Sequence, residues 1–94
     1  SLTPRDLEKI VDLRLSELEE RLIDLDLSLE VTSAAKNLLA KQGYNKEYGA
    51  RPLTRVIESK IEAPLSEKIV KGEINEGDLV KVRVRKGAIA VCLQ

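Results

Sequence analysis

The stretch Gly43-Tyr-Asn-Lys-Glu-Tyr-Gly-Ala-Arg-Pro-Leu53 holds both tyrosines of this chain, two of its five glycines, and an arginine directly before a proline. Proline suits the first position of a helix, because its φ is already helical and its missing N–H would have had no partner there. We therefore expect a helix to begin at Pro52, with Arg51 at its start. Tyr44 and Tyr48 are expected to pack within the loop and hold its shape rather than to act in catalysis.

The charge of Arg51 is unusual at this place, because the start of a helix carries partial positive charge and disfavours a cation by a few tenths of a kcal/mol. One interpretation is that Arg51 and the free N–H groups face a shared anion such as phosphate, which a guanidinium can clamp with two parallel hydrogen bonds. The other is a solvated arginine, paired with Glu47 across the loop. Position alone favours the solvated arginine, since surface ion pairs of this kind are common and contribute little.

Length and composition indicate one domain over residues 1–94. The formal net charge is zero, with 34% charged and 43% apolar residues, so no general attraction to nucleic acid or to a membrane is expected. Histidine is absent and Cys92 is the single cysteine, which excludes the usual zinc sites, a histidine-based triad and an internal disulfide within this chain. We therefore expect no metal site, and the single cysteine suits a reducing compartment. We also expect a soluble, intracellular piece, because neither a bilayer-spanning run nor a signal-peptide pattern occurs.

The first third of the chain predicts a long helix and a strand. Thr3, Pro4 and Asp6 provide an N-cap, a first-turn proline and a capping-box partner. Leucines at three- and four-residue spacing then predict a helix over residues 4–25. Between residues 5 and 26 this helix carries eight acidic and four basic side chains, which is most simply a solvated face. Alternating apolar and polar residues predict a strand over residues 27–32.

Two helices are expected in the middle of the chain. Thr32 can cap a helix that Gly43 ends in a left-handed turn. The helix that begins at Pro52 meets Pro64, whose ring removes a hydrogen bond and disfavours a helical Ala63. We therefore expect a kink or a break there, followed by a short helix over residues 65–70 that ends at Gly72.

The C-terminal third predicts a β-hairpin. Strands over residues 80–85 and 88–93 are joined by Lys86 and Gly87, which fit a tight turn. The strand over residues 27–32 can pair with this hairpin to give a three-stranded sheet, because an isolated hairpin would be marginal. A basic row alternates with valines in the first hairpin strand, but no exposed aromatic accompanies it to stack a base, so a solvated or partner-facing strand is favoured over nucleic-acid binding.

Three stretches together resemble a known family. They are Lys9-Ile-Val-Asp-Leu-Arg-Leu15, Gly43-Tyr-Asn-Lys-Glu-Tyr-Gly-Ala-Arg-Pro-Leu53, and Ile61-Glu-Ala-Pro-Leu65. At this order and spacing the chain resembles, over essentially its whole length, the C-terminal small subdomain of the second AAA+ module of Clp ATPases, most closely the ClpB-type disaggregases. The resemblance implies an α+β small (lid) subdomain with three to four helices and a three-stranded sheet, in the order α-β-α-α-β-β with a kink at Pro64.

The resemblance also implies a role for Arg51 as the second sensor residue, which contacts the γ-phosphate of ATP. It implies that Gly49 and Ala50 let the backbone approach the nucleotide, and, more weakly, that Leu7, Ile10 and Val11 lie toward the adenine. ATP and Mg²⁺ would be held mainly by an adjoining large subdomain. The implied partners are that subdomain in cis, neighbouring subunits of a homohexamer, and unfolded or aggregated client proteins.

The chain lacks the Gly-x-x-x-x-Gly-Lys-Ser/Thr phosphate loop and a strand that ends in the acidic pair that holds Mg²⁺. It is therefore expected not to hydrolyse ATP by itself and to be a fragment of a larger chaperone ATPase, located in the cytoplasm or in a mitochondrion or plastid. Two alternatives remain open. The parent protein is a ClpC- or ClpA-type unfoldase that feeds a protease, or the chain is a free-standing interaction adaptor.

Overall fold

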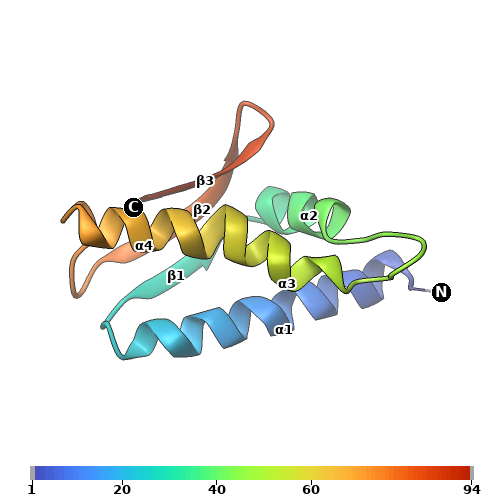
Figure 1. Ribbon diagram of the computed structural model, residues 1–94, viewed down its shortest axis with the longest axis horizontal. Helices are drawn as coiled ribbons and strands as arrows, with labels where there is room; N and C mark the ends of the chain where they lie inside the picture. Colours follow the sequence, from blue (N-terminus) through green and yellow to red (C-terminus); the bar gives the residue numbers. More distant parts are fainter. Residues whose placement is uncertain (1, 94) are drawn as a thin grey trace.

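The computed structural model describes residues 2–93 and has helices packed against one face of a three-stranded sheet, which confirms the predicted α+β class (Figure 1). Its elements, in order, are α1 (Pro4–Ile23), β1 (Ser28–Val31), α2 (Ser33–Gln42), α3 (Pro52–Ile57), the π-helical turn η1 (Glu58–Glu62), α4 (Ala63–Val70), β2 (Leu79–Arg85) and β3 (Ala88–Leu93).

Helix α1 begins with the predicted capping box. The Thr3 hydroxyl accepts a hydrogen bond from the Asp6 N–H at 3.1 Å, and the Asp6 carboxylate accepts one from the Thr3 N–H at 3.1 Å. The helix ends at Ile23, two residues before the predicted end, because the chain turns through Asp26 with a φ of +53° on its way into β1.

The capping box makes the stability of this chain dependent on pH. The hydrogen bond from the Thr3 N–H, together with that to the Thr3 side chain, lowers the pKa of Asp6 from its ordinary value of 3.8. The Asp6 carboxylate therefore contributes its full stabilisation above pH 3.8, the pKa of the unfolded state. This stabilisation is lost as the pH falls through the lower pKa that Asp6 has in the folded state. We expect Asp6→Asn to lower the urea midpoint at pH 7 and to have no effect in acid, where both side chains are neutral. An equal loss at both pH values would contradict this account.

Helix α2 starts at the predicted N-cap, where the Thr32 hydroxyl accepts from the Ala35 N–H at 3.1 Å. It ends at Gly43 as predicted, but the conformation of this glycine differs from the prediction. Gly43 has a φ of −91°, so it does not form a left-handed turn. Glycine is needed there for space, because a Cβ at position 43 would lie 2.6 Å from the Leu53 Cδ1 and 2.8 Å from the Leu53 Cα. Close contact between these two positions fixes where α3 starts relative to α2.

The sequence predicts a kink or a break at Pro64. The helical segment Pro52–Val70, which comprises α3, η1 and α4, is continuous, so no break occurs, and the irregularity is the π turn η1, which ends two residues before Pro64. Ala63 is helical, with φ −64° and ψ −48°, although a proline follows it. The wide turn η1 makes this possible: the Ala63 N–H donates to the carbonyl of Glu58, five residues back, instead of four. Gly72, which follows α4, has a φ of +78°, the left-handed conformation that is expected of a glycine at the end of a helix.

The sheet has the strand order β1-β2-β3, with β1 and β2 parallel and β2 and β3 antiparallel, as needed for the three-stranded sheet predicted. Lys86 and Gly87 both have positive φ, of 52° and 77°, which is the tight hairpin turn predicted for this dipeptide. At the other end of β2, the Gly77 N–H donates to the Asp26 carbonyl at 2.7 Å. This bond joins the turns that lead into β1 and β2.

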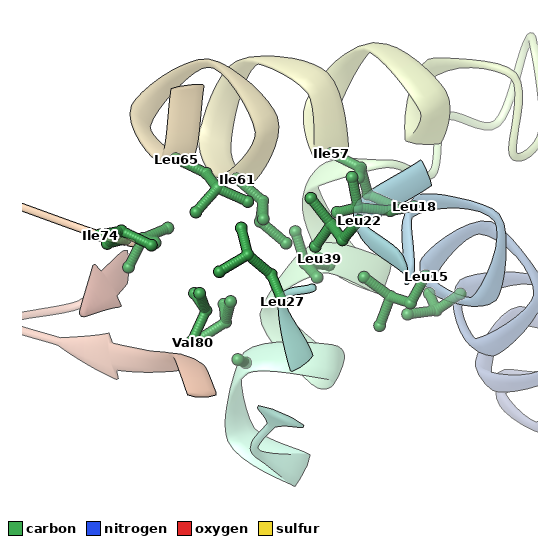
Figure 2. Packing of buried hydrophobic residues seen from close by; sticks show 14 of the residues in the cluster. Leu15, Leu18, Leu22, Leu27, Leu39, Ile57, Ile61, Leu65, Ile74 and Val80 are labelled. Carbon is green, nitrogen blue, oxygen red and sulfur yellow. The ribbon is translucent and has the colours of Figure 1, made fainter. Parts of the chain in front are cut away.

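One apolar cluster occupies the space between the helices and the sheet, and Figure 2 shows α3, η1 and α4 contributing side chains that point toward it. Its fully or almost fully buried members come from every helix, from β2 and β3, and from the segments that lead into β1 and β2. They are Val11, Leu15, Leu18, Leu22, Leu27, Ala35, Leu39, Leu53, Ile57, Ile61, Leu65, Ile74, Val80, Val82 and Val91. Among residues 2–93, no helix is long and apolar enough to cross a membrane.

Candidate functional site

The loop between α2 and α3 is held by its own backbone. Asn45 and Gly49 exchange two backbone hydrogen bonds, of 2.8 and 2.6 Å, and form an isolated bridge. The Asn45 side-chain oxygen accepts from the N–H groups of Glu47 and Tyr48, at 2.7 and 3.2 Å. Gly49 closes the turn with a φ of +64°, a value that glycine adopts at little cost. The loop therefore brings the chain to Arg51 in a defined direction.

Arg51 lies directly before α3, at the position that the sequence predicts. Its N–H donates to the Tyr48 carbonyl at 3.3 Å, and its side chain is exposed. Within residues 2–93 it takes part in none of the ion pairs, so the predicted alternative of a pair with Glu47 is not formed. Gly49 and Ala50 beside it are half-buried. The guanidinium is therefore available to an anion outside this chain.

A groove of about 550 Å³ lies between the start of α1 and the end of α2. Leu7, Ala40 and Tyr44 give it an apolar wall, and Lys36 and Lys41 are among its polar lining residues. Tyr44 is half-buried along this groove, whereas the Tyr48 side chain is 53% exposed and only its backbone takes part in the hydrogen bonds of the loop. Arg51 is not among the residues that line this groove. The start of α1 and the α2–α3 loop nevertheless lie at the same end of the long axis of the molecule (Figure 1).

The structure places the three apolar residues of α1 that the resemblance singled out at different depths. Leu7 lines the groove, and Ile10 is half-buried against the core. Val11 is 0% exposed, so its side chain has no surface that a ligand could contact in this conformation. Of these three residues, only Leu7 and Ile10 are therefore accessible for direct contact.

An ion pair between α1 and η1 was not predicted. The Arg21 Nη2 lies 3.0 Å from Glu62 Oε1, and the Arg21 Nε donates to Glu62 Oε2 at 3.2 Å. The two residues are 41 positions apart, and no local sequence signal links them. Among residues 2–93, no group of three or more His, Cys, Asp or Glu side chains could hold a metal ion.

A long helix and a continuous helical segment over a small mixed sheet agree with the fold expected for an AAA+ C-terminal small subdomain. A family model described as the C-terminal, D2-small domain of ClpB protein matches residues 2–82. The chain belongs to this family.

Curated relatives cover almost the whole chain. Chaperone protein ClpB of Clostridium tetani is 43% identical over 90 residues, which are 96% of this chain. Heat shock protein hsp98 of Neurospora crassa is 42% identical over 92 residues, also 96% of this chain. Negative regulator of genetic competence ClpC/MecB of Bacillus subtilis is 42% identical over 91 residues, 97% of this chain. The matching segments make up only 10%, 10% and 11% of these relatives, so the chain spans about a tenth of their length.

Proposed function

We propose that this chain is the nucleotide-sensing and oligomer-assembly subdomain of an ATP-dependent Clp-type chaperone, here called the parent, which unfolds and disaggregates proteins. The observation that carries the proposal is the exposed Arg51, unpaired among residues 2–93, in a chain of the ClpB D2-small family. An arginine in this state can make charge-assisted hydrogen bonds to phosphate without first breaking an internal ion pair.

In this proposal Arg51 is the second sensor residue and contacts the γ-phosphate of ATP. The nucleotide and its Mg²⁺ are held mainly by the adjoining large subdomain, and this chain supplies the arginine. Gly49, with its positive φ, and the small Ala50 allow the backbone to come close to the nucleotide. When the γ-phosphate leaves, the charge-assisted contact is lost and the small subdomain is free to rotate, which couples hydrolysis to a hinge motion.

The adenine side is assigned more weakly. Ile10, which is half-buried at the edge of the core, remains a candidate contact, while the fully buried Val11 acts only by packing behind it. The parent is the ATPase in this proposal, and the chain alone does not hydrolyse ATP because the phosphate loop and the Mg²⁺-binding acidic pair are not in its sequence.

The proposed partners are the large subdomain in cis, neighbouring subunits of a homohexamer, and unfolded or aggregated clients of the parent. Charge suggests two assembly surfaces. One is the acidic outer face of α1, and the other is the basic row of β2, where Lys81, Arg83 and Arg85 alternate with the core-facing Val80 and Val82.

A second candidate is the same subdomain in a ClpC- or ClpA-type unfoldase that feeds a protease. It is supported by the 42% identity to the ClpC/MecB protein of Bacillus subtilis, which lies within the 40–45% range of the ClpB relatives. The free-standing adaptor has less support, because the matching segments of the relatives are parts of much longer proteins.

Arg51→Ala in the parent tests the sensor role. We expect ATP turnover to fall about tenfold or more, because a preorganised donor to developing negative charge is removed. Affinity for ADP should change less than twofold, since ADP lacks the contacted phosphate. Steady-state turnover and ADP binding by calorimetry give the two readings.

Arg55→Ala is the matched control, because Arg55 is an exposed arginine one turn further along α3 that forms no ion pair among residues 2–93. Turnover that is unchanged in Arg51→Ala, or lowered equally in both variants, would remove the sensor assignment.

A further inference from the structure

The helical segment that begins after Arg51 is not regular throughout: the π turn η1 in its middle, here called the joint, separates α3 from α4. Between Glu58 and Glu62 the regular four-residue hydrogen bonding gives way to a π turn, and Pro64 has no N–H to contribute. Turns of this kind are rare within helices and often lie at functional sites. On one side of the joint is α3 with Arg51, and on the other is α4, whose Leu65 is anchored in the core.

The Arg21–Glu62 pair bridges this joint to α1. Both oxygens of Glu62 accept from the guanidinium, at 3.0 and 3.2 Å, so the contact fixes a direction as well as a distance. Arg21 is steadied on its own helix by a 3.5 Å contact from Nη1 to the Glu17 carbonyl. The hydrogen bonds to Glu62 are the largest cause of the raised pKa of Arg21.

No other ion pair within residues 2–93 joins α1 to the helical segment. Arg14–Glu17 lies within α1, Lys36–Asp12 joins α2 to α1, and the two remaining pairs lie at the end of α4. The Arg21–Glu62 pair is largely exposed, with side-chain exposures of 54% and 33%, so its expected contribution to stability is small. Its geometry suits a different task, which is to hold η1 in one rotational setting.

We infer that Arg21 and Glu62 are positioning residues, which hold the π turn so that α3 presents Arg51 in the direction required for its task. The inference rests on the proposed sensor function of Arg51. Glu62 lies eleven residues beyond Arg51, or about 16 Å along a helix, so a small rotation at the joint moves the guanidinium by a distance that matters for a hydrogen bond.

The test uses the parent with Glu62→Gln, with Arg21→Gln, and with the exchanged pair Arg21→Glu plus Glu62→Arg. We expect each single variant to lower kcat/KM for ATP about three- to tenfold, with little change in ADP affinity or in the urea midpoint of unfolding. The exchanged pair should recover most of the loss, because it restores the two opposite charges. Arg14→Gln is the matched control and should leave turnover unchanged; it breaks the pair within α1, in which the Arg14 Nη1 donates to both Glu17 carboxylate oxygens.

A double-mutant cycle separates the two proposals. If Arg51→Ala lowers turnover and Glu62→Gln adds nothing to it, the pair acts through Arg51 as inferred. If Arg51→Ala lowers turnover but Glu62→Gln has no effect, or has an effect that adds fully to that of Arg51→Ala, the positioning role is overturned and the sensor role stands. If Arg51→Ala has no effect, both are overturned. An equal loss from Arg14→Gln would also overturn the positioning role.

Discussion

Gly43→Ala is expected to lower the free energy of unfolding by about 2 kcal/mol or more, within the range that overpacking of a full core costs. The new Cβ would lie 2.6 Å from the Leu53 Cδ1 and 2.8 Å from its Cα. A change of rotamer can move the first atom but not the second, which is backbone. Relief therefore requires α2 and α3 to move apart, and Leu53 is only 1% exposed, so the movement opens the core.

Urea unfolding of the 94-residue chain measures this loss, with Gly49→Ala as the matched control. A Cβ at Gly49 would meet nothing within 4 Å, so the control carries only the strain of a φ of +64°, about 1–2 kcal/mol. Gly43→Ala should also lower turnover by the parent, because the displaced Leu53 is two residues from Arg51. A loss no larger than that of Gly49→Ala would contradict the close contact between α2 and α3.

The different roles of these two glycines show a limit of sequence-based prediction. A glycine that follows a helix usually supplies a positive φ, and that rule holds at Gly72, where φ is +78°. At Gly43 the glycine is required by Leu53, ten positions further along the chain. Spacing along the sequence carries no information about such an approach, so the existence of the helix end is predictable and its cause is not.

The spacing of the apolar residues explains why the helical segment Pro52–Val70 is continuous and contains a π turn. Leu53, Ile57, Ile61 and Leu65 are all buried and follow one another in steps of four residues. In a regular α-helix each such step advances about 40° beyond a full turn, so Leu65 would lie about 120° around the axis from Leu53. A π turn absorbs about one extra residue, which reduces this offset to about 20°. The wide turn thus keeps the four side chains on one face and also accommodates Pro64.

Only the part of the candidate site that depends on local sequence signals was predictable. The placement of Arg51 before α3 follows from Pro52, a local signal, and its exposure agrees with its polarity. The depth of Val11 and the Arg21–Glu62 pair depend on how distant elements pack, and the pair spans 41 positions. Side-chain roles set by local turn chemistry can be predicted from one sequence, whereas roles set by the packing of distant helices need the structure.

Ile61→Ala is expected to lower the free energy of unfolding by about 2–5 kcal/mol, the cost of removing a buried side chain and leaving a cavity. Ile61 is 0% exposed and lies in η1, midway between Ile57 and Leu65 along the buried face (Figure 2). The whole free energy of unfolding of a domain of this size is about 5–15 kcal/mol, so this one side chain accounts for a large share of it.

Urea unfolding of the 94-residue chain gives this difference from the shift in midpoint at unchanged slope. The control is Ile23→Ala, which removes the same atoms from a side chain that is 68% exposed and should shift stability by about 0.5 kcal/mol or less. Ile61→Val should fall between the two, at about 0.5–1.5 kcal/mol, because one methyl group is lost. In a regular α-helix the four side chains would spread over about 120°, so Ile61 and Leu65 would pack less directly with Leu53. Equal, small losses for Ile61→Ala and Ile23→Ala would contradict the burial of Ile61 on the core-facing side of η1.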